Sequence, residues 1–150
     1  MRVVYYDHAL SDSAQPGFRS GEAGSVHVTT EGDVETDVRV RIPPNSLHAL
    51  EGHGVVAALN RLPMATEPIA PGRDALLRPF SLGEASRILY EADRNTYGAT
   101  HEFVAHEAEV PEAVQYRIVI DNREYQRTLA RLQYLVTLGS REGFGVRIRL

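Results

Sequence analysis

The 150-residue sequence contains no cysteine, no lysine and no tryptophan. Without cysteine, disulfide scaffolds, thiolate zinc sites and cysteine nucleophiles are excluded. Without lysine, the chain has no Schiff-base chemistry, no lysine nucleophile and no P-loop for nucleotide phosphates. All 16 basic residues are therefore arginine, a composition typical of GC-rich, bacterial-like coding.

Long apolar segments are also missing. No run approaches the roughly 18 apolar residues that indicate a transmembrane helix. The N-terminal segment MRVVYYDHALSD is interrupted by an aspartate, a histidine and a serine. It therefore lacks the continuous apolar stretch of about 7–15 residues found in secretory signals. We expect a cytoplasmic protein that does not associate with membranes.

The length of the chain is near the commonest size of a single domain. A chain of this length buries about 68–70% of the surface that its unfolded form exposes, so it needs no metal or disulfide to stabilise a core. The sequence contains no internal repeat, no low-complexity tract and no linker between domains. We therefore expect one domain spanning residues 1–150.

Alternation of apolar and polar residues, together with β-branched and aromatic runs, predicts β-strands in six places. The clearest is VETDVRVRI, residues 34–42, which forms a predicted hairpin with SVHVTT through the glycine-containing residues 31–33. A second hairpin joins THEFVAHEAEV to AVQYRIVID. The short run of residues 3–6 and the final segment GFGVRIRL complete the predicted strands.

Apolar residues at intervals of three and four predict the helices. One covers residues 45–63, with Asn45 or Ser46 as its cap and a break at Gly52 to Gly54. A second begins at Ser81, which stands in capping-box spacing with Glu84. The last begins at Asp121 or Asn122 and runs to about Leu138, with Gly139 as its stop signal. Residues 7–25 and 64–80 are predicted to be irregular.

This order of elements predicts an α+β fold. We expect a single antiparallel or mixed sheet of about six strands, with two to four helices packed mainly on one face. The final strand would pair inside or beside this sheet, which explains a chain that ends on it. If that strand lies at an edge, its unpaired backbone would also allow a homodimer.

Arginines are concentrated on two predicted surfaces. One is the polar face of the sheet, which would carry five of them: Arg39, Arg41, Arg117, Arg147 and Arg149. The other is a row on the last helix, formed by Arg123, Arg127 and Arg131 at four-residue spacing, where like charges repel by a few tenths of a kcal/mol. Rows that folding does not require are candidate binding surfaces for an anionic partner.

The alternative is a solvated sheet face whose arginines pair with acidic residues across the strands, each pair contributing roughly 0.2–1 kcal/mol. The candidate acids are Glu35, Asp37, Glu107 and Glu109. Nucleic acid is a poor partner for either surface because the net charge is −4 and no aromatic residues interleave the arginines to stack on bases. A protein partner fits the pattern better.

Histidine spacing gives only weak indications of a metal site. His101 and His106 are five residues apart, whereas the zinc-protease motif needs a separation of four to share a helix face. His48 and His53 have the same separation, although a break at Gly52 could bring them together. His8 follows the first predicted strand at the mouth of a long loop. We expect no cofactor and no catalytic residue at these positions.

These observations favour a non-catalytic binding or adaptor protein of the inhibitor or immunity type. It would dock an acidic macromolecular partner through its arginine-bearing surfaces. The alternative is a small enzyme, or a domain that binds a small ligand or a metal. Its pocket would be formed by the 7–25 loop and the His48–His53 segment, because catalytic groups converge in space rather than along the chain.

Overall fold

The computed structural model describes residues 2–7, 24–29, 35–70, 72–108 and 113–150. Only the backbone is described for strand residues 2–7, 24–25, 27–29, 35–37, 105–108 and 113–116. His8 and most of the predicted 7–25 loop lie outside these residues. The strands are β1 (Arg2–Asp7), β2 (Gly24–Thr29), β3 (Glu35–Ile42), β4 (Asp74–Leu77), β5 (Thr100–Ala108), β6 (Ala113–Asp121) and β7 (Gly145–Arg149). The helices are α1 (Pro44–Gly52), α2 (Val55–Leu59), the short 3-10 helix η2 (Pro79–Ser81), α3 (Leu82–Arg94) and α4 (Asn122–Glu142).

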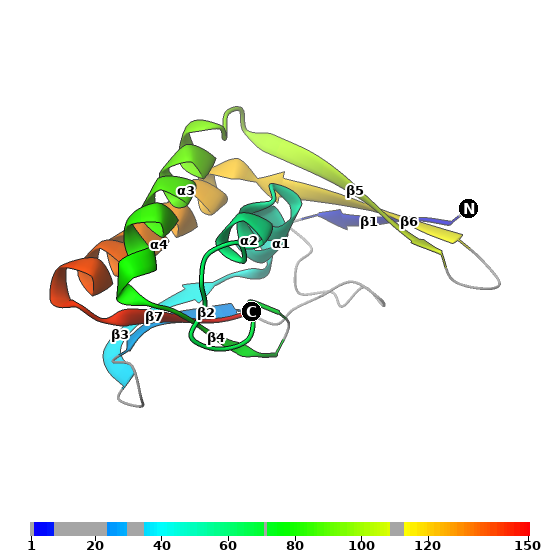
Figure 1. Ribbon diagram of the computed structural model, residues 1–150. Coiled ribbons are helices and arrows are strands. Elements are labelled where there is room, and N and C mark those ends of the chain that lie inside the picture. Colours follow the sequence, from blue (N-terminus) through cyan, green and yellow to red (C-terminus); the bar gives the residue numbers. More distant parts are fainter. Residues whose placement is uncertain (1, 8–23, 30–34, 71, 109–112) are drawn as a thin grey trace.

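The described strands form two sheets (Figure 1). Sheet A has the order β1-β6-β5, with β1 parallel and β5 antiparallel to β6. Sheet B has the order β3-β2-β7-β4, and each of its pairs is antiparallel. The α+β class is confirmed, but the prediction of one sheet of about six strands is wrong. The 21-residue helix α4 connects β6 of sheet A to β7 of sheet B. Alternation along a strand shows which side chains share a face, but it carries no information on which strands pair.

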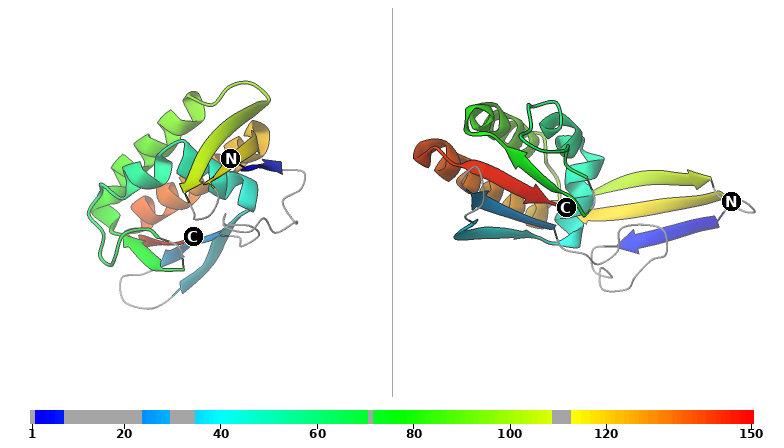
Figure 2. Two further views of the ribbon diagram at one scale, coloured as in Figure 1. Left: turned by 90° about the vertical axis from the view of Figure 1, so that its right-hand side faces the viewer. Right: turned by 60° about the horizontal axis from the view of Figure 1, so that its bottom comes forward.

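Helices cover one face of sheet B, while sheet A extends away from the helical layer (Figures 1 and 2). Helix α4 packs on β2, β3 and β7, and α3 packs on α4. The strand residues that face α4 are buried: Val26, Val40, Ile42, Val146 and Ile148. They meet the apolar stripe of α4, whose members include Leu129, Leu132, Leu135 and Val136. The helices thus lie on one face of sheet B, as the strand pattern indicated for the sheet as a whole.

Strand β7 lies inside sheet B, between β2 and β4. Val146 pairs with Val28 on one side and with Leu77 on the other. The predicted pairing of this strand is therefore confirmed. Because it is not an edge strand, it offers no unpaired backbone for a second copy of the chain.

Gly139 does not end α4, as the sequence suggested, because the helix continues to Glu142 and Gly143 takes the left-handed conformation at its C-cap (φ 76°). Glycine is needed at position 139 for another reason. A Cβ atom there would lie 2.9 Å from the carbonyl oxygen of Phe144 and 3.0 Å from the side chain of Leu82. The missing side chain thus allows the chain to turn back closely into β7.

The predicted break in the first helical segment is confirmed: α1 ends at Gly52, and Gly54 has a φ of 76° before α2 begins. Ser81 occupies the N-cap position of α3, as the sequence indicated, but its side chain makes no capping hydrogen bond. The expected cap at Asn45 or Ser46 is wrong. Asn45 and Ser46 lie inside α1, which begins at Pro44, and their side chains bind distant parts of the chain instead. Strand β4, in the proline-containing segment 64–80, was not predicted.

Two buried polar contacts join α1 to the junction between β6 and α4. The Asn45 side chain donates to the carbonyl oxygen of Asp121 (3.1 Å) and accepts from its backbone N–H (2.8 Å). About two turns further along α4, the hydroxyl groups of Ser46 and Thr128 are 2.7 Å apart. The Asp121 carboxylate caps α4 by accepting from the N–H groups of Arg123 and Glu124.

No helix of the described residues has the length and apolar character needed to cross a bilayer.

We expect Asn45→Ala to lower the free energy of unfolding by about 1–3 kcal/mol, because it leaves the backbone N–H of Asp121 without its partner, and an unsatisfied buried group costs about this much. Urea unfolding followed by circular dichroism measures the change. Asn95→Ala is the matched control, since Asn95 is exposed, and its effect should stay within about 0.5 kcal/mol. Equal effects of the two substitutions would contradict the importance of the junction.

Candidate functional site

The outer face of sheet B gathers four of the predicted arginines. Arg41 and Arg149 both pair with Ser25 of β2, one from each side, and Arg39 and Arg147 both pair with His27. Their neighbours along β3 and β7 are buried against the helices, whereas Arg39, Arg41 and Arg149 are exposed and Arg147 is half-buried. We call these four residues the arginine face.

Sheet geometry sets the spacing within the arginine face. Residues two apart on one strand are separated by about 6.8 Å, and strands two apart in a sheet by about 9.6 Å. Arg41, Arg147 and Arg149 form no ion pair with any residue whose side chain is described. Two acidic residues lie beside the arginine face: Asp74 of β4 pairs in register with Arg149, and Asp37 precedes Arg39 by two residues on β3. The arginine face thus brings four arginines together next to these two acids.

Arg117 does not belong to the arginine face. It lies on β6 in sheet A, and its guanidinium group is 3.1 Å from the carboxylate of Glu102 on β5. The prediction that it shares a sheet face with Arg39, Arg41, Arg147 and Arg149 is wrong, because the strand pattern cannot tell which of two sheets a strand joins. For Arg117 the alternative of a solvated sheet face applies, because Glu102 on the neighbouring strand forms an ion pair with it.

The arginine row of the last helix is exposed, as the sequence predicted. Arg123, Arg127 and Arg131 lie on the side of α4 that faces away from the core. The apolar stripe of the same helix packs on sheet B, so this row and the arginine face lie on different surfaces of the protein (Figure 2). A single partner surface therefore cannot use all eight predicted arginines together.

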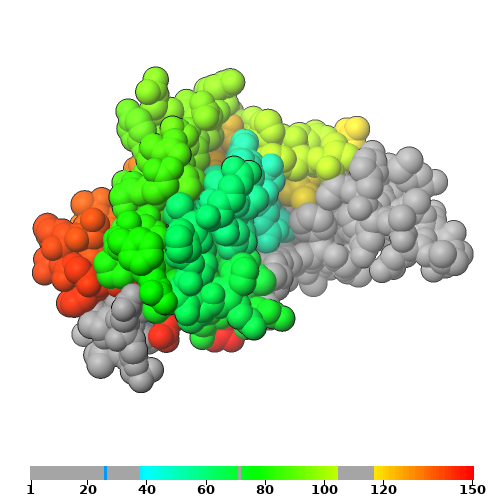
Figure 3. Space-filling view, viewed as in Figure 1, coloured from blue at the N-terminus to red at the C-terminus, as the bar shows by residue number. Residues whose placement is uncertain are grey.

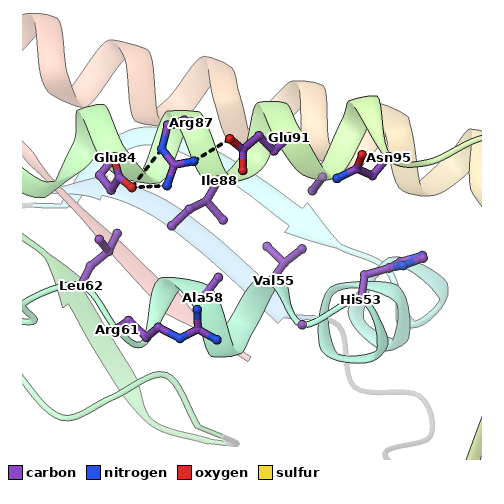
Figure 4. Close-up of a pocket in the computed structure, with 12 residues that line it drawn as sticks. His53, Val55, Ala58, Arg61, Leu62, Glu84, Arg87, Ile88, Glu91 and Asn95 are labelled. Carbon is purple, nitrogen blue, oxygen red and sulfur yellow. Dashed lines mark hydrogen bonds and ion pairs between the residues drawn. The ribbon is translucent and has the colours of Figure 1, made fainter.

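A groove with a volume of about 320 Å³ lies between α2 and α3 (Figure 4). The two helices lie side by side at the surface of the protein (Figure 3). The floor of the groove is apolar and is formed by Val55, Ala58, Leu62, Ile88 and Ala92. Arg61 stands on the α2 side, and Asn95 and His53 lie toward one end. Sequence reasoning missed this groove because its two walls come from separate helices.

The α3 wall of the groove carries a charged cluster (Figure 4). The Arg87 guanidinium binds Glu84 on one side and Glu91 on the other, at spacings of three and four residues. Its hydrogen bond holds the pKa of the Glu84 carboxyl below the ordinary value, and both acids raise the pKa of Arg87. This spacing was readable from the sequence as a helix-surface ion pair. Arg61 lines the α2 side of the same groove and forms no ion pair with a described side chain.

His53 links the end of the groove to sheet A. Its ring stacks on that of Tyr125 (5.3 Å between centroids, 11° between planes) and lies 4.8 Å from the ring of His101 and 4.7 Å from that of Phe103. Burial, and to a lesser degree His101, lowers the pKa of His53. The Tyr125 side chain is fully buried, which together with the nearby charge of Asp93 raises its pKa. Its hydroxyl has no hydrogen-bond partner among the described residues.

His48 and His53 are not brought together by the break after α1. His48 is buried within α1, at 3% exposure, whereas His53 is exposed at the C-cap. Across the part of the chain with described side chains, no three histidine, aspartate or glutamate residues converge in a way that could hold a metal ion. The weak metal site suggested by the spacing of His48 and His53 gains no support from this arrangement.

Comparisons with models of protein families, with curated proteins and with solved structures found no match to this chain. The function must therefore be argued from the arginine face and the groove themselves.

We expect the free energy of unfolding to fall as the pH drops through 6.5, the ordinary pKa of histidine. A group whose pKa is lower in the folded state binds fewer protons there than in the unfolded chain, so acidification favours unfolding. His53→Asn should make the urea midpoint less dependent on pH between 7.5 and 5.5 than in the parent protein. An unchanged dependence would show that His53 does not titrate in its contact with His101.

Proposed function

We propose that this protein is a non-catalytic binding protein that docks an acidic protein partner on the arginine face. The observation that carries the proposal is the strand register, which sets residues from β3 and β7 in two pairs on either side of β2. Folding alone does not require this arrangement, because the arginines of β3 and β7 lie on either side of β2, about 9.6 Å apart, where like charges repel one another weakly. A surface that tolerates this repulsion gains from an anionic partner.

Carboxylates are the partner groups that best match this surface. The guanidinium group presents a planar fork of donors that binds a carboxylate through two parallel hydrogen bonds. Glutamates four residues apart on a helix are separated by about 5–6 Å, close to the spacing along one strand of the arginine face. Exposed residues described on this face include no aromatic side chain, so the stacking platform used by single-stranded nucleic acids is not part of the described surface.

The test compares two charge reversals of equal size. Arg41→Glu/Arg147→Glu/Arg149→Glu alters the arginine face, and Arg123→Glu/Arg127→Glu/Arg131→Glu alters the exposed row of α4. We expect the first variant to bind fluorescent poly-glutamate at least tenfold more weakly at 50 mM salt, since each lost pair contributes about 0.2–1 kcal/mol and each glutamate adds repulsion. Fluorescence anisotropy gives the dissociation constants.

The second variant has the same change in net charge, so it controls for non-specific electrostatics. If it loses affinity as strongly as the first, the long-range field of the protein explains binding and the arginine face has no special role. If neither variant loses affinity, the proposal is wrong. Circular dichroism melting confirms that both variants are folded.

The groove between α2 and α3 favours a second candidate function, the binding of a small amphipathic ligand. Its floor of five apolar side chains can take a hydrocarbon body, and Arg61 lies where an acidic group of the ligand would reach it (Figure 4). Binding pockets commonly combine such an apolar lining with a few polar groups that orient the ligand. Because Glu84 and Glu91 already engage Arg87, the remaining positive group on the walls is Arg61.

Octanoate is a simple probe of this second function. We expect it to raise the melting temperature of the parent protein, because a ligand that binds only the folded state stabilises it. Arg61→Glu should abolish the rise, whereas Arg127→Glu, on the exposed side of α4, should leave it unchanged. Equal shifts in all three proteins, measured by differential scanning fluorimetry, would exclude the groove as the binding site.

A further inference from the structure

Strand β5 occupies one end of sheet A, and only one of its two edges is paired by a described strand. It pairs with β6 along all nine residues, from Thr100 opposite Asp121 to Ala108 opposite Ala113. No strand in the described part of the chain pairs with its other edge. The backbone N–H and C=O groups on such an edge form a template to which a further strand can be added.

The centre of this edge is apolar. Val104, the fifth residue of β5, is 47% exposed. The other large apolar side chains that are strongly exposed among the described residues lie on helices or on the turn after α3: Phe80, Tyr90, Tyr97 and Tyr134. An exposed valine in the middle of an unpaired edge strand favours contact with another protein surface.

The sequence around Val104 is complementary to itself. In antiparallel pairing of two copies about a two-fold axis at Val104, His101 stands opposite Glu107 of the second copy and Glu102 stands opposite His106. The symmetry repeats both pairs, giving four opposed histidine–glutamate pairs. Histidine can donate a ring N–H to a carboxylate in either protonation state, and opposite-charge pairs stabilise a sheet.

We propose that β5 binds a second copy of this chain in this register, so that two copies of sheet A form one continuous six-stranded sheet. Other registers lose the complementarity. A shift of two residues places His101 opposite Ala105 and Glu102 opposite Val104. A shift of one residue opposes His101 to His106 or Glu102 to Glu107. It would also place side chains from opposite faces of the two copies of β5 on the same side of the joined sheet.

The helical layers do not obstruct this arrangement. Phe103 and His101 point to the face of sheet A that meets His53 and Gly52 near the start of β5. The two-fold axis places the start of the second β5 beside the end of the first. The two helical layers therefore lie at opposite ends of the joined strands, consistent with the way sheet A extends from the body (Figure 1).

Strand β3, an edge strand of sheet B, has a similar sequence pattern about Val38, in which Glu35 would oppose Arg41 and Asp37 would oppose Arg39. The two centres differ in exposure. Val38 is partly buried against the core, whereas Val104 is exposed. Pairing through β5 covers more apolar surface at the axis, so we assign the contact to β5 and leave β3 as an outcome that the experiment distinguishes.

The experiment uses charge swaps measured by sedimentation equilibrium over a range of chain concentrations. His106→Glu creates only glutamate–glutamate contacts between positions 102 and 106, and Glu102→His creates only histidine–histidine contacts. We expect His106→Glu to weaken the dimer at least tenfold and Glu102→His to weaken it to a smaller extent. A 1:1 mixture of the two variants should associate as well as the parent, because every contact is again between histidine and glutamate.

Three further variants serve as controls. The double variant Glu102→His/His106→Glu should dimerise like the parent, and Val104→Glu should prevent dimerisation by placing two carboxylates at the axis. Arg39→Glu, on β3, should have no effect. Since Glu102 also binds Arg117, thermal melting checks that each variant is folded. A monomeric parent protein at 100 µM, a dimer insensitive to His106→Glu and Val104→Glu, or a dimer disrupted only by Arg39→Glu would each overturn the proposal.

Discussion

The buried contact between Asn45 and Asp121 is the constraint on which the relation of the two sheets depends. Asp121 ends β6, caps α4 with its side chain, and has both backbone groups bound by the amide of Asn45. The next residue, Asn122, donates to the carbonyl oxygens of Tyr97 and Gly98. One short segment thereby fixes where sheet A stops, where α4 starts and how α1 lies against both. Because α4 forms the inner layer behind sheet B, its direction also sets the position of the arginine face.

The sequence was sufficient to predict local structure but not to assign strands to sheets. Alternation in residues 38–42 and 145–149 correctly identified which side chains face a core, since the period of two is a property of the strand itself. Arg117 obeys the same alternation, yet it lies in the other sheet. Which strands pair depends on long-range contacts such as that of Asn45 with Asp121, and such contacts leave no periodic signal. Gly139 shows the same limit: it resembled a helix stop, but its role depends on Phe144 and Leu82.

The candidate surfaces were predictable to different degrees, because local spacing can be read from a sequence and long-range packing cannot. The α4 row follows directly from four-residue spacing and is exposed. The arginine face required the additional fact that β2 lies between β3 and β7, which joins residues from both ends of the chain. The groove between α2 and α3 was not foreseen, because Arg61 and the Glu84–Arg87–Glu91 cluster become neighbours only after α2 packs on α3. Surfaces built from one element can be inferred from a sequence, whereas those built from several need the tertiary structure.

The position of β7 also bears on how the protein reaches its folded state. Val26 pairs with Ile148, so the central ladder of sheet B joins segments separated by nearly the whole chain. Such non-local pairing slows folding, because the entropy of closing a long loop is lost before the contacts form. Arg41 and Arg149 become neighbours only when that ladder closes. A partner that recognises the four guanidinium groups together would therefore bind the fully folded protein and not a partly folded chain.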